Sequence, residues 1–182
     1  MDDAAVIDFF LRMYKEHKLS CTLAVSTESN PVKELILSLD KDRQERPRSL
    51  QIKVMKQVLP SSMPKKGIEA LSYFHVQFVS KLPFPINRMA AREVESLILF
   101  INRTLELPGF EVSELDEAVF YRYAWIIGEK GLDKHIVLGI TGVILMTLDL
   151  LSDMIEKIAS GAITFNQALE MALGIRDKMT GD

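Results

Sequence analysis

The sequence predicts an α+β fold in which an antiparallel sheet of about five strands is covered by helices, in the order α-β-β-β-α-β-β-α, with an extra helix at the C-terminus. Three observations predict it. Apolar residues recur at spacings of three and four near the start, middle and end of the chain. Between these segments apolar and polar residues alternate, which is typical of strands. Polar segments join consecutive strand patterns, which favours antiparallel neighbours.

The first element is a predicted helix over residues 2–18. Asp2 and Asp3 lie at its start, where negative charge interacts favourably with the helix dipole. Its apolar residues share one stripe: Val6, Phe9, Phe10, Met13 and Tyr14. We expect this stripe to face a core.

Alternating patterns predict the next strands. They are residues 35–39, 50–58 and 74–78. Alternation of this kind places one face of a strand against a core and the other toward water. Residues 21–27 are a candidate for an additional short edge strand, and Pro83 and Pro85 are expected to end the third main strand.

A second helix is predicted over residues 87–106, and Pro108-Gly109 is expected to end it. Its apolar stripe is Ala90, Val94, Leu97, Ile98, Ile101 and Leu105. Leu99 and Phe100 widen the apolar surface beyond that stripe. This helix therefore has more apolar surface than one face needs.

The remaining chain predicts two strands and two helices. The strands are residues 110–114 and 118–127, and the second is rich in the aromatic and β-branched residues that favour strands. A long helix over residues 133–160 follows, and a last helix is predicted over residues 164–175.

The composition favours a single folded domain. The chain has 182 residues, of which 48% are hydrophobic and 26% charged, enough for one domain with a sizeable core. We predict one α+β domain over residues 1–182, with a core at about residues 3–160 and a helical extension at residues 161–182. The net charge of −3 gives no general attraction to nucleic acid or anionic membranes.

Cysteine content and the apolar run of residues 136–148 bear on the compartment. Cys21 is the only cysteine, which excludes an internal disulfide and a multi-cysteine zinc site. The apolar run is shorter than the roughly 20 residues that cross a bilayer, so we interpret it as a buried helix rather than a membrane span. The acidic start of the chain does not fit a signal peptide. We expect a cytoplasmic protein.

No motif in the chain predicts catalysis. His17, His75 and His135 each lack a second histidine at metal-binding spacing. The loop at residues 128–131 lacks the glycine spacing of a phosphate loop. We therefore predict no catalytic, metal-binding or cofactor-binding residue and no enzyme, although a pocket built from scattered residues stays a third possibility.

Two surfaces are candidates for binding. The apolar surplus of the long helices and of the aromatic strand predicts a protein interface, made of Leu99, Phe100, Val119, Tyr121, Tyr123 and Trp125. The C-terminal helix could instead cover this surface. The alternative is a basic segment at residues 41–66 that would bind nucleic acid or another anion, through Arg43, Arg46, Arg48 and Lys53. A solvated strand edge rich in Lys and Arg is its simpler interpretation.

Part of the chain resembles a known family. The residues are Ile101-Asn102-Arg103-Thr104-Leu105-Glu106-Leu107-Pro108-Gly109-Phe110, then Val119-Phe120-Tyr121-Arg122-Tyr123, then Gly131-Leu132 before the long helix. This pattern resembles the YbjN-like proteins, which share the fold of type III secretion chaperones. The resemblance covers about residues 3–160 in element order and residues 101–132 in detail. It implies a non-enzymatic homodimer that binds an extended segment of a client protein, with no catalytic residues to carry over.

Overall fold

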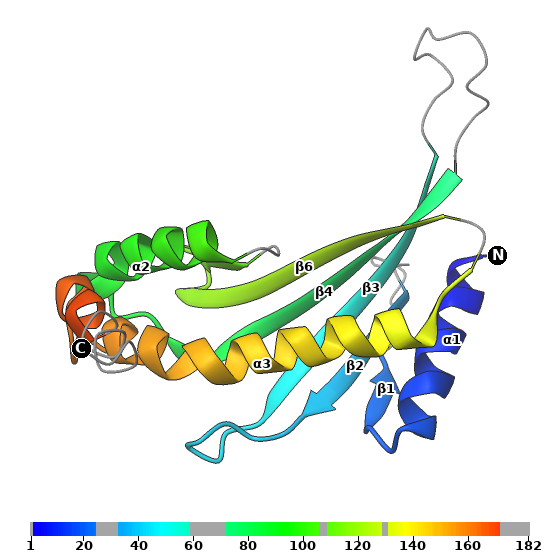
Figure 1. Ribbon diagram of the computed structural model, residues 1–182, viewed down its shortest axis with the longest axis horizontal. Helices are drawn as coiled ribbons and strands as arrows, with labels where there is room; N and C mark the ends of the chain where they lie inside the picture. Colours follow the sequence, from blue (N-terminus) through cyan, green and yellow to red (C-terminus); the bar gives the residue numbers. More distant parts are fainter. Residues whose placement is uncertain (1, 25–32, 59–71, 106–108, 129–130, 172–182) are drawn as a thin grey trace, which may run out of the picture. The chain divides into compact units, whose positions relative to one another are not determined.

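The protein, described by a computed structural model over residues 2–24, 33–58, 72–105, 109–128 and 131–171, has an α+β fold with a six-stranded antiparallel sheet (Figure 1). The elements are α1 (Asp3–Glu16), β1 (Cys21–Leu23), β2 (Lys33–Leu39), β3 (Arg48–Val58), β4 (Ser72–Pro85), η1 (Arg88–Ala90), α2 (Ala91–Thr104), β5 (Phe110–Ser113), β6 (Ala118–Gly128) and α3 (Lys134–Ala159). The backbone is helical again over residues 165–171. The strand order in the sheet is β1-β2-β3-β4-β6-β5. The predicted fold class is confirmed.

The chain forms two compact units. The first unit contains Met1–Ser80 and Arg122–Ile144, and the second contains Lys81–Tyr121 and Leu145–Asp182. β4, β6 and α3 each contribute residues to both units.

In the first unit, α1 contacts β1, β2 and β3 through its predicted apolar stripe. Asp2 is its N-cap, because its Oδ1 accepts a hydrogen bond of 2.8 Å from the backbone N–H of Ala5. The ring of Phe10 is fully buried, with its centroid 6.0 Å from that of Phe78 on β4 and 6.1 Å from that of Tyr14. The predicted stripe is thus buried except at Phe9, which is half-buried, and Ile7 is buried in addition.

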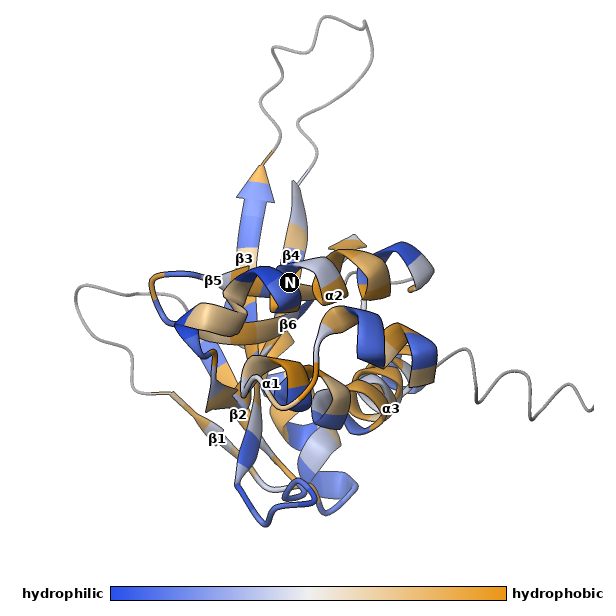
Figure 2. Ribbon diagram, turned by 90° about the vertical axis from the view of Figure 1, so that its left-hand side faces the viewer, coloured by the Kyte–Doolittle hydropathy of each residue, from blue (hydrophilic) through white to orange (hydrophobic). Residues whose placement is uncertain are grey.

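Alternating apolar residues of β2, β3 and β4 form the part of the same core that the sheet contributes. The antiparallel register aligns Leu35 with Ile52 and Ile52 with Phe78, and all three side chains are fully buried. Toward the end of β3 the chain leaves the core: Lys56 and Gln57 are exposed, and this end of β3 is blue in Figure 2. The prediction that one face of each strand is buried is confirmed through Val54 of β3 and is wrong at Val58, which is 60% exposed.

A buried hydroxyl pair also lies in the first unit. The hydroxyl of Tyr14 on α1 lies 2.8 Å from Oγ1 of Thr141 on α3. Since Thr141 donates its own proton to the carbonyl of Val137, at 2.9 Å, Tyr14 is the donor to Thr141. Burial raises the pKa of Tyr14 to about 12.

β4 is longer than the sequence predicted. We expected Pro83 and Pro85 to end this strand, but it continues through Pro83 and ends at Pro85. The pairing between β3 and β4 reaches only to Gln51 and Val79. Pro83 therefore lies beyond the end of that ladder, where a missing N–H costs no hydrogen bond to β3.

The candidate edge strand at residues 21–27 exists in shortened form. Cys21–Leu23 pairs antiparallel with β2, opposite Leu37 through Leu35, while residues 25–27 lie outside the described chain. With this strand the sheet has six members rather than about five.

In the second unit, α2 buries the predicted residues Val94, Leu97, Ile98 and Ile101. β5 and β6 form an antiparallel hairpin in which the ring centroids of Phe110 and Tyr121 lie 5.1 Å apart. The predicted C-terminal helix over residues 164–175 is observed from residue 165 to 171, and its remainder lies outside the described chain. The C-terminal extension thus contributes a helix to this unit.

Candidate functional site

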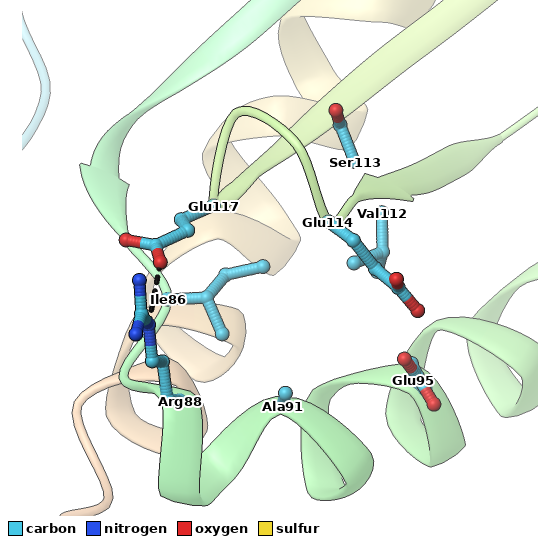
Figure 3. A pocket seen from close by; sticks show the side chains of 8 residues that line it. All are labelled: Ile86, Arg88, Ala91, Glu95, Val112, Ser113, Glu114 and Glu117. Carbon is cyan, nitrogen blue, oxygen red and sulfur yellow. Dashed lines mark hydrogen bonds and ion pairs between the residues drawn. The ribbon is translucent and has the colours of Figure 1, made fainter.

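A pocket of about 300 Å³ lies in the second unit, between the start of α2 and the β5–β6 hairpin (Figure 3). Its lining is Ile86, Arg88, Ala91, Glu95, Val112, Ser113, Glu114 and Glu117. η1 and α2 supply one wall, and the hairpin supplies the other. The Asn87 side chain fixes the start of the first wall, because its Oδ1 accepts from the N–H of Met89 at 3.0 Å.

The charge of this pocket is negative. Three carboxylates line it, and Arg88 offsets one of them because its Nε donates to Glu117 Oε1 at 2.7 Å. Figure 3 shows the carboxylates of Glu95 and Glu114 facing each other from opposite walls. Two facing carboxylates favour a cation between them. Among the described residues no group of three His, Cys, Asp or Glu side chains could hold a metal ion, so a basic side chain fits this pocket better.

β5 gives the pocket a strand edge. β5 is last in the strand order, and no other described strand pairs with its outer edge. The N–H of Phe110 donates to Asn102 Oδ1 at 2.8 Å, and Asn102 Nδ2 donates to the Phe110 carbonyl at 2.7 Å. The backbone groups of Phe110 therefore point away from β6 and its partner Tyr121. The backbone groups of Val112, two residues further along β5, point the same way. Its side chain lines the pocket.

The structure separates the six predicted interface residues. Leu99 is 73% exposed and Phe100 is 42% exposed. The expectation that one strand face forms an open patch does not hold for Val119 and Tyr121, which are fully buried. Val119 and Tyr121 lie on the face of β6 that packs against the core, where the ring of Tyr121 contacts that of Phe110.

Tyr123 and Trp125 continue the same face of β6 and are partly buried. The ring of Tyr123 lies 6.0 Å from that of Phe78 in the first unit. The helical residues 165–171 contact α2 instead, with the ring of Phe165 6.1 Å from that of Phe100. Phe165 is also held by its N–H, which donates to Glu93 Oε2 at 2.7 Å. The C-terminal helix thus contacts the predicted surface at Phe100.

The predicted basic residues have partners within the chain. Arg46 Nε donates to Asp42 Oδ2 at 2.7 Å, and Arg48 is buried with its Nε donating to the Asp40 carbonyl at 2.8 Å. Lys53 Nζ lies 3.9 Å from Glu34 Oε1. Arg43 is exposed. The charge available to an anion is smaller than the sequence indicates, because Arg46, Arg48 and Lys53 already face oxygen acceptors.

Cys21 and His17 have structural surroundings. Burial raises the pKa of the Cys21 thiol, whereas nearby Lys15 lowers it, and the net shift is upward. A raised pKa makes a thiol a poorer nucleophile at neutral pH. The Nδ1 atom of His17 lies 2.9 Å from the Met13 carbonyl at the end of α1.

α3 has a second apolar face that the sequence interpretation missed. Within the described chain it is the one helix long and apolar enough to cross a membrane by length and composition, and 33% of its most apolar 18 residues are buried. Ile136 is 51%, Met146 62% and Leu150 73% exposed. We interpreted residues 136–148 as buried, which is wrong for this outer face. The spacing of these residues, at intervals that place them on one side of a helix, could have indicated this second apolar face.

Comparison with family models, curated proteins and solved structures finds no match to this chain. Its function is therefore inferred from the geometry of the β5 edge, the pocket and the helix surfaces.

Proposed function

We propose that this chain is a non-enzymatic, cytoplasmic protein-binding module that acts as a homodimer and binds an extended segment of a client protein. The observation that carries the proposal is the outer edge of β5, where the backbone of Val112 faces outward beside an acidic pocket. An extended peptide can add to such an edge through backbone hydrogen bonds, while pockets select its side chains. The resemblance to secretion chaperones supports the same mode.

The pocket specifies the chemistry of the client. Glu95 and Glu114 face each other across it, so a Lys or Arg side chain between them would relieve their repulsion. Ile86, Ala91 and Val112 supply apolar contacts in the same pocket. The preferred client segment is therefore a short, mostly apolar strand with one basic residue.

The surface of α2 extends the binding region. Leu99 and Phe100 are exposed on this helix, which packs beside β5 in the same unit. Neighbouring exposed apolar side chains are typical of protein interaction sites. These residues keep their predicted role as interface candidates.

The test uses a labelled nine-residue peptide of alternating Val and Thr with one central Lys, and a second peptide in which Glu replaces the Lys. Fluorescence anisotropy with the full chain should show at least tenfold tighter binding of the Lys peptide. Glu95→Gln and Glu114→Gln should remove most of that preference, whereas Glu16→Gln, an exposed acid on α1, should not.

A backbone variant separates edge pairing from simple charge attraction. Val112→Pro removes an N–H that points away from β6, so the β5–β6 ladder keeps its hydrogen bonds. It should abolish peptide binding while the thermal midpoint changes little, and Val112→Ala should retain binding. Equal binding by the Pro and wild-type chains would overturn the proposal.

A further inference from the structure

We propose that the outer face of α3 is the surface through which two copies of this chain associate, with the two α3 helices antiparallel. This inference rests on the homodimer of the proposed function and names its contact. The residues concerned are Ile136, Gly139, Val143, Met146 and Leu150, which we call the outer seam.

The outer seam has the spacing of a coiled-coil interface. Its residues follow one another at intervals of three, four, three and four, which is the pattern of a and d positions in a heptad. The opposite face of α3 is already used, because Val137, Ile144 and Leu148 are fully buried. A helix that is apolar on both faces needs a second covering surface. Among the described residues of the outer seam, the large side chains of Ile136, Met146 and Leu150 are exposed.

Two glycines in α3 point to close approach by another helix. Outside the backbone of α3 itself, an added Cβ at Gly139 or Gly142 would meet no described atom within 4 Å, so packing among the described residues does not require glycine at either position. Each costs about 1 kcal/mol of helix stability relative to alanine. Glycine at a helix contact lets the two axes approach more closely, and a helix of a second copy would supply that contact.

The seam is complementary to itself in the antiparallel direction. In one register Ile136 lies opposite Met146 of the second copy, and Gly139 lies opposite Val143, so a small residue meets a larger one. In the same register each Gly142 flanks the Gly142 of the second copy, and His135 flanks Asp149. An imidazole beside a carboxylate is a favourable pair.

The parallel direction is disfavoured by Asp153, the next position of the same heptad pattern. Parallel helices would place Asp153 opposite Asp153 of the second copy within the seam, which is a repulsive contact. Antiparallel helices place it beyond Lys134, at the start of the other α3, where the helix dipole favours a carboxylate.

Disulfide cross-linking tests the direction and register. In a Cys21→Ser background, Ile136→Cys and Met146→Cys chains, one carrying a size tag, are mixed and oxidised. The mixed disulfide should form in excess of either symmetric one, because two copies of Cys at position 136 would lie about 15 Å apart along the axis. Symmetric disulfides in preference to the mixed one would overturn the antiparallel arrangement.

Charge insertion tests whether the seam is the contact at all. Met146→Glu should raise the dimer dissociation constant at least tenfold, whereas Met89→Glu, at a methionine that is 94% exposed on η1, should leave it unchanged. A wild-type dimer unaffected by Met146→Glu and without the mixed disulfide would overturn this inference and leave the homodimer intact. A monomer that binds lipid vesicles and loses them on Met146→Glu would overturn both, because α3 would then be a membrane contact.

Discussion

The side-chain amide of Asn102 forms two hydrogen bonds with the backbone of Phe110. Phe110 N–H donates to Oδ1 at 2.8 Å, and Nδ2 donates to the Phe110 carbonyl at 2.7 Å. Asn102 lies on the last turns of α2, and Phe110 begins β5. The amide thus takes the place of a neighbouring strand at the first residue of the edge, and it fixes where the free part of that edge begins.

Asn102→Ala should lower the free energy of unfolding by about 2 kcal/mol, because both backbone groups of Phe110 lose their partners. Chemical denaturation monitored by circular dichroism measures the change. Asn102→Asp keeps an acceptor for the Phe110 N–H but offers no donor to the carbonyl, so its loss should be intermediate. Equal stability of the Ala variant and the wild type would show that the two bonds contribute nothing.

Gly109→Ala should be destabilising because the new Cβ would overlap Asn102 Oδ1 and lie 2.9 Å from Asn102 Cγ. The overlap displaces the amide from Phe110. In the Asn102→Ala background the same substitution should cost much less, since most of the obstacle is gone. A double-mutant cycle measures this coupling, and strict additivity would contradict the assigned role of Gly109.

Tyr14→Phe should lower the free energy of unfolding by about 1–2 kcal/mol at neutral pH, because Thr141 loses its buried donor. The folded pKa of Tyr14, about 12, lies above the ordinary tyrosine pKa of 10.0. The stabilisation from neutral Tyr14 is therefore complete below pH 10 and is lost as the pH rises through about 12.

Denaturation at increasing pH tests whether the stabilisation by Tyr14 is lost as the pH rises. The advantage of wild type over Tyr14→Phe should shrink above pH 10, since phenylalanine does not ionise. Ultraviolet difference absorbance should show one fewer late-ionising tyrosine in the variant than in the wild type. A constant advantage across this range would contradict the burial of the hydroxyl.

Asp42→Asn should weaken the turn between β2 and β3. Burial raises the pKa of Asp42, but hydrogen bonds from Arg46 and Gln44 lower it further, and the net shift is downward. The stabilisation is thus present above the ordinary pKa of 3.8 and is lost as the pH falls through the lower folded value. The stability difference between wild type and variant should therefore disappear in acid. A difference that persists there would contradict the ion pair with Arg46.

The sequence predicted the fold through features that are local. The alternation of Leu50, Ile52 and Val54 and the stripe around Phe10 are periodic, so they specify which face is buried. Pro83 was misread because a proline ends a strand only where its N–H would be paired, and pairing depends on the neighbouring strand.

The candidate site was less predictable because it is assembled from separate segments. Glu95 and Glu114 lie on opposite walls of the pocket, and no spacing in the sequence places them together. The aromatic residues of β6 were predicted as a surface, but alternation gives the same signal for a core face and an interface face. Only the contact of Tyr121 with Phe110 distinguishes the two. The outer seam of α3 has a heptad spacing in the sequence. The apolar residues of the inner face led us to interpret the whole helix as buried.

The homodimer itself can be tested by light scattering coupled to size exclusion, on the wild-type chain over a hundredfold range of concentration. We expect a species of twice the monomer mass at the higher concentrations, with dissociation only at the lowest. A monomer of 20.6 kDa at every concentration would contradict it.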